Sequence, residues 1–453
     1  MRTDARSGEP QQNRHIAVVG SGIAGLSAAW LLAPYHRVTL FEADSRAGGH
    51  ANTVLVPTGA TTTPVDTGFI VYNGANYPNL VALLDHLRVP SLETDMSFAA
   101  SLDGGALEYS SNGLTGFLGQ PGNITNLRFL AMARDIGRFY TLAPRDICRP
   151  EAALLTLGDY LEANRYSAGF IEDHLLPMGA AIWSTTSAQM RAYPLVAFVR
   201  FWMNHGLLKI VGQPLWRTVK GGSHEYVTRM LSRIKDVRLG AGVTQISRDA
   251  VGVTLTDRTG QRQHFDDVII ATHADQALRL LADVDETEQA MLGAFAYTDN
   301  DAVLHADTNL MPKRRGVWAS WNYIGERTDT GDRPLCVTYW MNSLQGLDPA
   351  HPLFLTLNPT RDIAPETVRG TFSYSHPLFD RRAVEAQQHL WRLQGTRRTW
   401  FAGSYFGHGF HEDALQSGLA AAEAVGGVRR PWTVANESGR INLQPEPMLE
   451  AAE

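Results

Sequence analysis

The stretch HIAVVGSGIAGLSAAWLLAPYHRVTLFEA, residues 15–43, decides the fold of this chain. It opens with Ile16–Val19, a short β-branched run that predicts a buried strand of a parallel sheet. The next six residues, Gly20-Ser-Gly-Ile-Ala-Gly25, match the pattern GxGxxG. Apolar residues at helical spacing follow until Pro34, which is a typical stop signal for a helix. The order of strand, glycine turn and helix predicts the first half of a βαβ unit.

The second half of this unit supplies an acid at its end. A second predicted strand, Arg37–Phe41, is followed by Glu42, 17 residues after Gly25. Gly20 permits a tight turn, Gly22 lets a pyrophosphate approach the backbone, and Gly25 lets the helix pack closely on the strand. Free N–H groups at the helix start face the phosphates, and the carboxylate of Glu42 accepts hydrogen bonds from a ribose. The segment therefore predicts dinucleotide binding, with an acid that would repel the 2′-phosphate of NADP.

The residues after Glu42 favour FAD over NAD. Ala43-Asp-Ser-Arg46-Ala-Gly48-Gly49-His50 follows the second strand. With it the chain resembles the flavin-dependent amine oxidase and phytoene desaturase superfamily, in which an acid at the strand end is followed by RxGG. In that family the added glycines pass close to the pyrophosphate and the flavin. Gly68-Phe-Ile70 resembles the next family segment, beside the isoalloxazine ring, and Val243 stands where the family's backbone clasps the adenine.

A second set of matches lies near the other end of the chain. The stretch FAGSYFGHGFHEDALQSGLAAAEAV, residues 401–425, resembles the closing motif of the family, which is a strand, AG, a loop and EGAxxSG on a helix. Asp413 replaces the usual glycine of that motif. A helix N-terminus aimed at the pyrimidine end of a flavin would stabilise negative charge on the reduced ring. The resemblance implies bound FAD, and the residues expected to bind it are Gly20, Ser21, Gly22, Ile23, Ala24, Gly25, Glu42, Ala43, Arg46, Gly48, Gly49, His50, Gly68, Phe69, Ile70, Val243, Gly403, Glu412, Asp413 and Ala414.

The matched segments lie far apart in the sequence, so the FAD-binding domain is expected to be discontinuous. The fold class is α/β, a Rossmann-type FAD-binding domain with a discontinuous α+β substrate domain. The FAD-binding domain is assigned residues 14–75, 218–295 and 396–428. The substrate domain is assigned residues 76–217 and 296–395. The polar ends of the chain, residues 1–13 and 429–453, are expected to be flexible tails.

Composition excludes several other classes of protein. The chain has 453 residues, too many for one simple core, and its formal net charge of −6 gives no reason to expect a nucleic acid partner. Its two cysteines, Cys148 and Cys336, form no CxxC pair. Neither a disulfide framework nor a zinc site is expected, and the reducing cytosol is the default compartment. No signal peptide or membrane-spanning run of about 20 apolar residues is evident.

The residues expected near the reacting atoms differ from those of an amine oxidase. Amine oxidases of this fold usually place a lysine near the flavin N5 and tyrosines beside it. None of the four lysines here matches that lysine motif, and Phe410 stands where the family often has a tyrosine. His50, His305, Phe410 and Tyr405 are the catalytic candidates, although each is also compatible with ordinary packing. His408 and His411 lie in a glycine loop without a third ligand, so no metal site is expected.

Segments rich in Trp, Phe, Met and Leu between residues 183 and 216 have two interpretations. They line an apolar tunnel for an acyl or isoprenoid chain, or they form the core of a helical substrate domain. Within the first insertion, Asp103-Gly104 between alternating runs predicts a β-hairpin. A helical face with Phe129, Met132, Ala133, Ile136 and Tyr140 is bordered by arginines. Such a face either packs on the core or lies on a membrane surface.

Within the superfamily, the chain most resembles a bacterial branch of NAD/FAD-binding proteins with GGHANT and GFHEDA segments, a branch associated with fatty-acid modification. The resemblance implies an FAD-dependent oxidoreductase that removes hydride from an unsaturated or methyl-branched fatty acyl chain, with desaturation or double-bond isomerisation as the result. The alternatives are an amine or amino-acid oxidase and a flavin-binding protein without turnover. The expected location is the cytoplasm, with peripheral contact to the inner face of the membrane as one option. The expected partner is a small apolar substrate.

Overall fold

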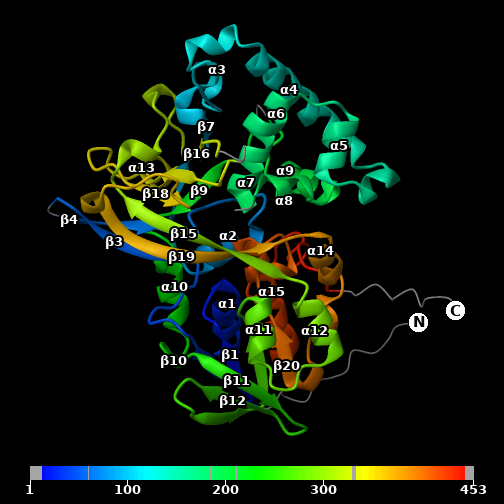
Figure 1. The fold of residues 1–453 in the computed structure, drawn as a ribbon. Coiled ribbons are helices and arrows are strands. Elements are labelled where there is room, and N and C mark those ends of the chain that lie inside the picture. The colour runs from blue at the N-terminus through cyan, green and yellow to red at the C-terminus, as the bar shows by residue number, and fades with distance from the viewer. Residues whose placement is uncertain (1–12, 60, 184–185, 210–211, 329–332, 444–453) are drawn as a thin grey trace.

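A computed structural model describes residues 13–59, 61–183, 186–209, 212–328 and 333–443 of the chain. The outer parts of the two predicted tails, residues 1–12 and 444–453, lie outside this description. Figure 1 shows two halves, one holding β1, β20, α1 and α15 and the other holding β7, β16 and the helices α3 to α9. The fold is of the mixed α/β class that the sequence predicts.

The first half is built on a five-stranded parallel sheet in the order β10-β2-β1-β14-β20. Three distant parts of the sequence contribute to it. Its strands are β1 (His15–Val19), β2 (Arg37–Phe41), β10 (Asp236–Arg238), β14 (Asp267–Ile270) and β20 (Thr399–Phe401). The two predicted strands at the start of the chain are thus confirmed, and β2 has the predicted limits. Nearly all side chains of β1 and β2 are buried, as expected for a parallel sheet covered on both faces.

Helices α1 (Ile23–Leu32) and α15 (His411–Gly426) pack against each other beside this sheet. All ten residues of α1 are buried, which explains why small and apolar residues follow its glycine turn. The approach of the two helices depends on Gly418, where a Cβ atom would lie only 2.1 Å from the carbonyl oxygen of Ala24. The start and the end of the sequence therefore meet in one helix pair.

The second half contains a seven-stranded sheet in the order β19-β15-β18-β17-β16-β7-β8. Its strands are β7 (Phe98–Leu102), β8 (Leu107–Ser110), β15 (Ala296–His305), β16 (Trp321–Gly325), β17 (Val337–Trp340), β18 (Phe354–Leu357) and β19 (Val368–Leu378). The parallel pairing of β7 with β16 joins the two insertions in one sheet. The antiparallel pair β7–β8 turns at Asp103–Gly105, so the predicted hairpin is confirmed.

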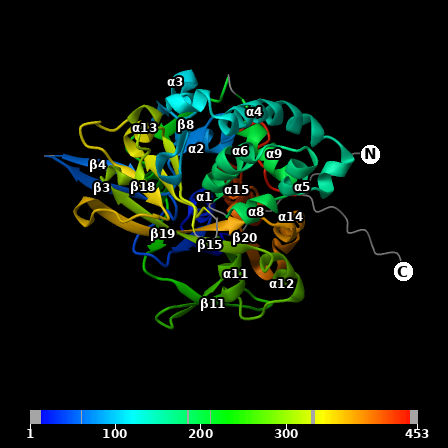
Figure 2. The same cartoon turned by 45° about the horizontal axis from the view of Figure 1, so that its top comes forward.

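Helices and smaller sheets surround these two sheets. Three small sheets are formed by β3 (Thr53–Thr58) with β4 (Thr61–Asp66), by β5 (Val71–Asn73), β9 (Trp216–Val219) and β6 (Ser91–Thr94), and by β11 (Val243–Arg248), β12 (Val253–Asp257) and β13 (Arg262–Phe265). The other helices are α2 (Pro78–His86), α3 (Gly113–Phe117), α4 (Leu127–Asp146), α5 (Leu157–Ala163), α6 (Ala168–Phe170), α7 (Leu176–Trp183), α8 (Ser187–Arg191), α9 (Leu195–Asn204), α10 (His224–Leu231), α11 (Ala274–Leu280), α12 (Glu286–Leu292), α13 (Met341–Gln345) and α14 (Arg381–Gln387). Figure 2 shows α4, α5 and α9 on the flank opposite the β3–β4 hairpin.

The described part of the C-terminal tail is packed against the protein, which corrects the prediction of a flexible tail from residue 429. Arg430 is buried, and its guanidinium donates hydrogen bonds to Glu423 (2.8 Å) and to Asn79 (3.0 Å). Arg440 donates a hydrogen bond to Asp413 at 3.2 Å. Polar composition alone predicts solvation, but these arginines have buried partners on α2 and α15. The segment 429–443 is thus part of the fold.

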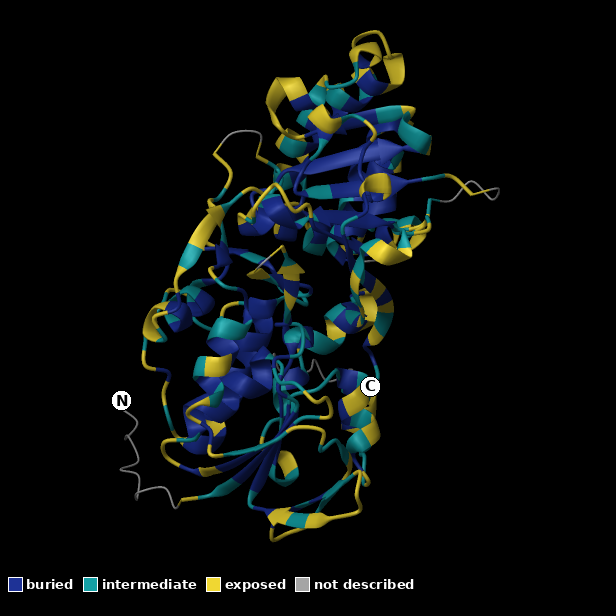
Figure 3. Cartoon of the chain, turned by 90° about the vertical axis from the view of Figure 1, so that its left-hand side faces the viewer, coloured by how far each residue is buried: buried dark blue, intermediate teal, exposed yellow. Residues whose placement is uncertain are grey.

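The predicted amphipathic face of α4 is turned into the protein. Phe129, Met132 and Ile136 are buried, as the first of the two interpretations of this helix expects. Ala133 and Tyr140 border an internal cavity on the same side. The side chains that α4 leaves in solvent are others, among them Leu127 and Leu130. Figure 3 shows buried residues running through both halves, with exposed ones along the outside of the molecule.

Candidate active site

A large cavity runs between the two halves of the protein. Its volume is about 1290 Å³, and it is lined by the loops that follow β1, β2, β14 and β20 and by the helices and sheet of the other half. Ligand pockets are usually about 300–1,000 Å³, so this space can hold a cofactor together with a substrate. The loops belong to the carboxyl ends of the parallel strands, where α/β sheets bind their ligands.

The glycine turn after β1 is shaped for a phosphate-bearing ligand. A Cβ atom on Gly25 would lie 1.9 Å from the carbonyl oxygen of Gly20, and one on Gly20 would lie 2.7 Å from that of Ala271. These two glycines are therefore required by the protein itself. Gly22 is different, because a Cβ atom there would meet no protein atom within 4 Å, and its φ of −59° suits any residue. The described protein does not itself require a glycine at this position, and the open space beside Gly22 could hold a ligand.

The first turn of α1 adds hydrogen-bond donors to this place. Gly22 is the N-cap of the helix, and no side chain caps the first N–H groups. The first N–H groups of a helix have no partner within the helix, and they favour an anion. The first turn of α1 carries no acidic side chain that would repel a phosphate. Gly22 and the N-terminus of α1 together form a cradle for a pyrophosphate.

Glu42 is held in place before any ligand arrives. Its Oε2 atom accepts a hydrogen bond from the Ser21 amide at 2.9 Å and one from the Ser21 hydroxyl. Its Oε1 atom accepts one from the Asp44 amide at 2.9 Å. A carboxylate has about four acceptor positions, so it keeps room for the hydroxyl groups of a ribose. Glu42 is therefore preorganised at the end of β2 beside the glycine turn.

Arg46 carries a buried donor that lacks a partner in the protein. Its Nη2 atom donates a hydrogen bond to the carbonyl oxygen of Gly49 at 2.8 Å, which fixes the guanidinium under the Gly48-Gly49 loop. Its Nη1 atom is buried and has no hydrogen-bond partner. An unpaired buried guanidinium nitrogen is costly unless a ligand oxygen reaches it. Arg46, like Gly22, fits a bound dinucleotide.

Most of the residues expected to bind the cofactor border this cavity. All of them except Gly25, Glu412 and Asp413 line it, including Val243 at the start of β11 and Phe69 and Ile70 before β5. Phe69 also stacks on His411, with ring centres 3.9 Å apart. Gly25 is absent from the lining because it packs against Gly20, as its predicted role in helix–strand packing requires.

Glu412 does not face the cavity, which corrects its prediction as a cofactor-binding residue. The carboxylate is fully buried and caps the N-terminus of α2. It accepts hydrogen bonds from the amides of Asn79 (3.1 Å) and Leu80 (3.0 Å). Gln416 and the Asn79 side chain donate two more. Burial raises the pKa of the Glu412 carboxyl above its usual value. This residue joins α2 to α15 instead of contacting a ligand.

Asp413 also faces away from the cavity, so its predicted contact with the cofactor is corrected. Its Oδ2 atom accepts a hydrogen bond from the amide of Phe410 at 2.8 Å. Its Oδ1 atom accepts one from Arg440 at 3.2 Å. The family's usual residue here is glycine, and this chain accommodates a carboxylate by turning it toward a buried arginine. The helix N-terminus itself still reaches the cavity through Ala414.

The catalytic candidates divide into three that border the cavity and one that does not. His50, Tyr405 and Phe410 line it. Phe410 stacks on Phe201 of α9, with ring centres 4.9 Å apart. His305 lies instead in the core of the seven-stranded sheet, fully buried, where its Nε2 is 2.7 Å from the Thr356 hydroxyl. Its prediction as a base is therefore wrong, because both ring nitrogens have structural partners.

The His50 ring lies close to the rings of two other histidines and a tyrosine. The sequence did not indicate this group. The His50 ring is 5.5 Å from the His376 ring, 6.5 Å from the His273 ring and 5.0 Å from the Tyr374 ring. All four border the cavity, and the Nε2 atom of His50 is buried without a partner. Burial lowers the pKa of His50 well below its usual value and that of His376 to about 4. The imidazoles are therefore neutral at pH 7.

The second half contributes an apolar wall to the same cavity. α4, α7 and α9 supply small and aromatic side chains, and the seven-stranded sheet supplies a face opposite them. The apolar lining includes Met96, Phe98, Phe117, Ala133, Ile136, Met178, Ala181, Ile182, Trp183, Phe201, Trp321, Tyr339, Leu355 and Leu357. Phe198 and Trp202 of α9 are also fully buried, but their side chains pack in the hydrophobic core of the protein. Part of the Trp- and Phe-rich segments thus lines the cavity, and part of them forms the core of the helical region.

Few charged side chains line the apolar part of the cavity. Of the four lysines, all of which are described, only Lys209 borders the cavity, and its side chain is exposed at the rim. Lys313 lies elsewhere, beside Glu108 and Gly105. Arg279 also borders the cavity, and it pairs with Asp275 at 2.7 Å. The absence of a lysine near the centre agrees with the missing lysine motif.

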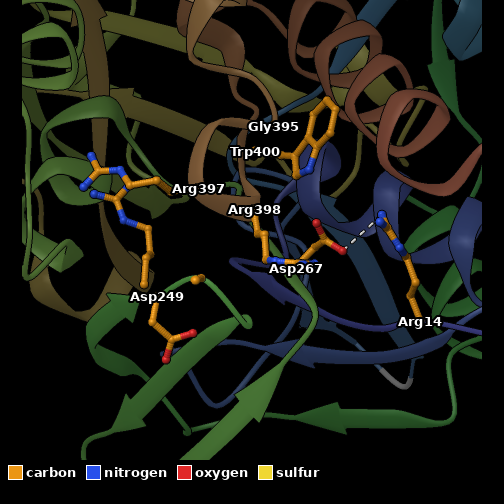
Figure 4. A pocket seen from close by; sticks show the side chains of 9 residues that line it. Arg14, Asp249, Asp267, Gly395, Arg397, Arg398 and Trp400 are labelled. Atoms are coloured by element: carbon orange, nitrogen blue, oxygen red, sulfur yellow. Dashed lines mark ion pairs between the residues drawn. The ribbon is translucent and has the colours of Figure 1, made fainter.

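A second, smaller pocket lies at the opposite ends of the parallel strands. Its volume is about 690 Å³, and Arg14, Asp267, Arg397 and Arg398 are among its lining residues (Figure 4). Arg14 pairs with Asp267 at 3.2 Å, and Arg397 pairs with three carboxylates of the α12 region. This pocket lies at the amino ends of β1, β14 and β20, away from the ligand-binding edge of an α/β sheet.

Two further features of the described residues concern metal binding and membrane spans. They contain no group of three or more His, Cys, Asp or Glu side chains placed to hold a metal ion. None of their helices combines the length and the hydropathy needed to traverse a bilayer.

Comparisons with known proteins agree with this geometry. The sequence profile of the flavin containing amine oxidoreductases matches residues 23–303. Short stretches match snake L-amino-acid oxidases, with 61% identity over 41 residues for the Bungarus fasciatus enzyme and 54% over 52 residues for that of Notechis scutatus scutatus. These matches cover 9% and 11% of this chain and 8% and 10% of the two oxidases, so the chain matches only about a tenth of the length of these curated relatives.

Solved structures share the fold over almost the whole chain. The CLA-producing fatty acid isomerase from P. acnes has a TM-score of 0.64 and 15% identity, with 92% of this chain and 99% of that chain covered. Putrescine oxidase bound to putrescine has a TM-score of 0.63 and 15% identity, with 91% and 98% covered. Cyclohexylamine oxidase from Brevibacterium oxydans has a TM-score of 0.61 and 14% identity, with 92% and 99% covered. At this identity the likeness shows the fold alone.

Proposed function

The chain belongs to the family of flavin-containing amine oxidoreductases, and we propose that it removes hydride from an unsaturated or methyl-branched fatty acyl chain. It is an FAD-dependent oxidoreductase. The observation that carries the proposal is the apolar wall formed by α4, α7, α9 and the seven-stranded sheet, which continues from the glycine turn in one cavity. An acyl chain fits such a lining, because burying its methylene groups is favourable by about 0.8 kcal/mol each.

The residues that would hold FAD are those that leave open space, an unpaired donor or a free acceptor beside the cavity. Gly22 and the N-terminus of α1 would take the pyrophosphate together with the free Nη1 atom of Arg46. Glu42 would accept the ribose hydroxyl groups. Val243 would border the adenine. His50, near the start of the sequence, and Ala414, near its end, would both border the flavin ring.

The reaction asks little of the protein as an acid or a base. FAD, when bound, would supply the acceptor for the hydride, which carries two electrons and one proton. A carbon beside a double bond releases hydride more readily than a saturated one, because the cation that develops there is delocalised. The chain's own part is to orient that carbon and to exclude water, and the neutral imidazoles of His50 and His376 do not oppose a developing positive charge.

Two outcomes of hydride removal are compatible with this site. In a desaturation, the substrate loses a hydride and then a proton from the neighbouring carbon; a neutral imidazole of the cavity, such as that of His50 or His376, would accept the proton, and dioxygen or a redox partner would take up the two electrons of the hydride. In an isomerisation, the hydride returns to another carbon of the same allylic system, without net oxidation. The structural likeness to a fatty acid isomerase supports either outcome at the level of fold only.

An anaerobic experiment tests the proposal. Free unsaturated and methyl-branched fatty acids of several lengths are added to the yellow protein, while the visible flavin absorbance is followed and the double-bond positions of the products are determined by mass spectrometry. Bleaching or a shifted double bond with at least one acid is the expected result. A protein that does neither across a broad panel would overturn the acyl-chain proposal.

The short matches to L-amino-acid oxidases favour one second candidate, oxidation of amines or amino acids. It predicts that amines bleach the flavin and that hydrogen peroxide appears in air. The apolar lining and the absence of a central lysine weigh against it. A yellow protein inert to both panels would indicate a flavin-binding protein without turnover.

We also propose that the protein works in the cytoplasm, at the inner face of the membrane. Long acyl chains are poorly soluble in water and are held in membrane lipids. Fractionation of cells followed by detection of the protein in soluble and washed membrane fractions tests the location.

A further inference from the structure

An exposed apolar surface lies at the outer end of the substrate half. Within 17 residues of sequence, five large aliphatic side chains stand in solvent, with exposed fractions from 37% at Leu118 to 81% at Leu127. We call these residues the leucine patch, and they are Leu114, Leu118, Ile124, Leu127 and Leu130. Scattered single apolar residues on a surface are normal, whereas a group of them marks an interaction site.

The patch follows from the way α3 and α4 begin. Leu114 and Leu118 are four residues apart on α3 and its C-cap, so they project from one side of that helix. Asn126 caps α4, and Leu127 and Leu130 occupy its first turns on the side opposite the buried Phe129. Figure 1 shows α3 and the start of α4 at the end of the molecule farthest from β11 and β12. No described element covers these side chains, because each is exposed.

The charge pattern around the patch is that of a surface that meets lipid. No charged residue occurs from Tyr109 to Leu127, a stretch that includes most of the patch. Five arginines and two aspartates follow on α4 and just beyond it, through residue 149, and Arg128, the arginine nearest the patch in sequence, is paired with Glu172 and Asp173. Interfacial segments combine exposed apolar side chains with basic residues that attract anionic headgroups.

The patch is continuous with the cavity of the active site. Leu114 belongs to both, because it lines the cavity together with Gly113 and Phe117 of α3. On the next helix, Ala133, Ile136 and Gly137 line the same end of the cavity. An acyl chain that leaves a bilayer at the patch would therefore meet apolar side chains all the way into the cavity.

We propose that the leucine patch seats the protein on an anionic lipid bilayer and that the substrate acyl chain passes from the lipid into the cavity beside Leu114. This inference deepens the proposed function and depends on it for the nature of the substrate. Membrane seating itself does not depend on turnover. A second copy of the chain would be a competing occupant, but an apolar patch that continues through Leu114 into the cavity suits a lipid surface, which supplies acyl chains, better than a second protein.

Vesicle sedimentation tests the seating. The FAD-bound protein is mixed with vesicles of phosphatidylglycerol and phosphatidylcholine, or of phosphatidylcholine alone, and the pelleted fraction is measured. We expect clear sedimentation with the anionic vesicles and less with the neutral ones. The double variant L114E/L127E should bind anionic vesicles roughly tenfold more weakly, because two apolar anchors are replaced by charges.

A matched control is available at the other end of the molecule. Val251 is 73% exposed in the turn between β11 and β12, and Val251→Glu should leave sedimentation unchanged. Flavin content and the melting temperature of L114E/L127E should match those of the parent, which excludes misfolding. Equal sedimentation of parent and double variant would overturn the proposal, as would a patch-dependent dimer in gel filtration without vesicle binding. Vesicle binding without acyl turnover would refute the proposed function and leave the seating intact.

Discussion

Arg440 lies 3.2 Å from the carboxylate of Asp413, and the pair is almost fully removed from water. Asp413 stands in the first turn of α15, and Arg440 lies beyond the end of that helix, so the contact ties the C-terminal segment to the rim of the active site. Arg440 also donates a hydrogen bond to the carbonyl oxygen of Asn76 at 2.6 Å, before α2.

Breaking this pair should destabilise the protein. Removing one partner of a buried ion pair typically costs about 3–5 kcal/mol, because the other charge is left unpaired. Arg440→Met should therefore lower the melting temperature strongly. The double variant D413G/R440M, which restores the family's usual glycine, should recover most of the loss. Thermal unfolding followed by circular dichroism measures both, and a double variant no more stable than R440M would contradict the pairing.

Two neighbouring glycines should respond differently to the same substitution. Gly22→Val should fold but lose FAD, because its side chain enters the space of the pyrophosphate and meets no protein atom. Gly25→Val should fail to fold, because its Cβ atom would collide with the carbonyl oxygen of Gly20 at 1.9 Å. Circular dichroism reports the fold and absorbance near the flavin maximum reports the cofactor. A fully yellow G22V protein would refute the assignment of the cradle.

Glu42→Ala should weaken FAD binding without unfolding the chain. The change removes the acceptor of a ribose hydrogen bond, and a hydrogen bond to a charged group contributes about 1.5–3 kcal/mol. We expect the dissociation constant to rise by roughly ten- to a hundredfold. Titration of the apoprotein with FAD by fluorescence quenching measures it. Unchanged affinity would show that the ribose lies elsewhere.

Cavity size should set the preferred chain length of the substrate. Ala181 of α7 borders the apolar part of the cavity, and Ala181→Trp would fill space there. We expect the rate of flavin reduction to fall for long acyl chains and to fall less for short ones. Ile182→Ala enlarges the same region, so in this variant the rate of flavin reduction by long acyl chains should rise relative to that by short ones. Equal effects on all chain lengths would indicate a change in folding or cofactor position instead.

Acid should destabilise the protein because of its buried histidines. Burial holds the pKa of His305 and His376 at about 4, and that of His205 and His411 at about 3. The unfolded histidine has a pKa near 6.5. Between pH 6.5 and 4 the unfolded chain therefore binds more protons than the folded protein, so the free energy of unfolding decreases as the pH is lowered. Asp66, whose pKa is raised by burial to about 6, opposes this, as do Glu412 and Asp267, whose pKa values are also raised by burial.

The variant His305→Asn isolates one of these contributions. It keeps an acceptor for the amide of Asp307 but cannot titrate. Its loss of stability between pH 7.5 and 5 should be smaller than that of the parent by roughly 1–2 kcal/mol. Denaturant melts at the two pH values measure the difference. An identical loss in both proteins would show that His305 is not neutral and buried in solution.

Local sequence predicted the parts of the fold that depend on neighbouring residues. The strand β2, the glycine turn with Glu42, and the hairpin at Asp103 are each encoded within a few positions, by periodicity or by the conformational freedom of glycine. The family resemblance added the second glycine loop at Gly403, which also borders the cavity.

Contacts between distant segments could not be predicted in this way. His50, His273 and His376 come from three separate loops and strands, and no local pattern marks them as neighbours. Glu412 matched a motif, but only the position of α2 decides that its carboxylate caps a helix. The arginines of the C-terminal segment have the composition of a tail, and their partners become visible only in three dimensions.

The parallel sheet of the first half has a consequence for synthesis of the protein. β1 needs β14, about 250 residues downstream, and the sheet is completed only by β20 and covered by α15 near the end of the chain. A ribosome must therefore release almost the entire polypeptide before the cradle for the prosthetic group can close. Contacts of such long sequence separation slow folding, so truncated products of translation should be colourless and prone to degradation.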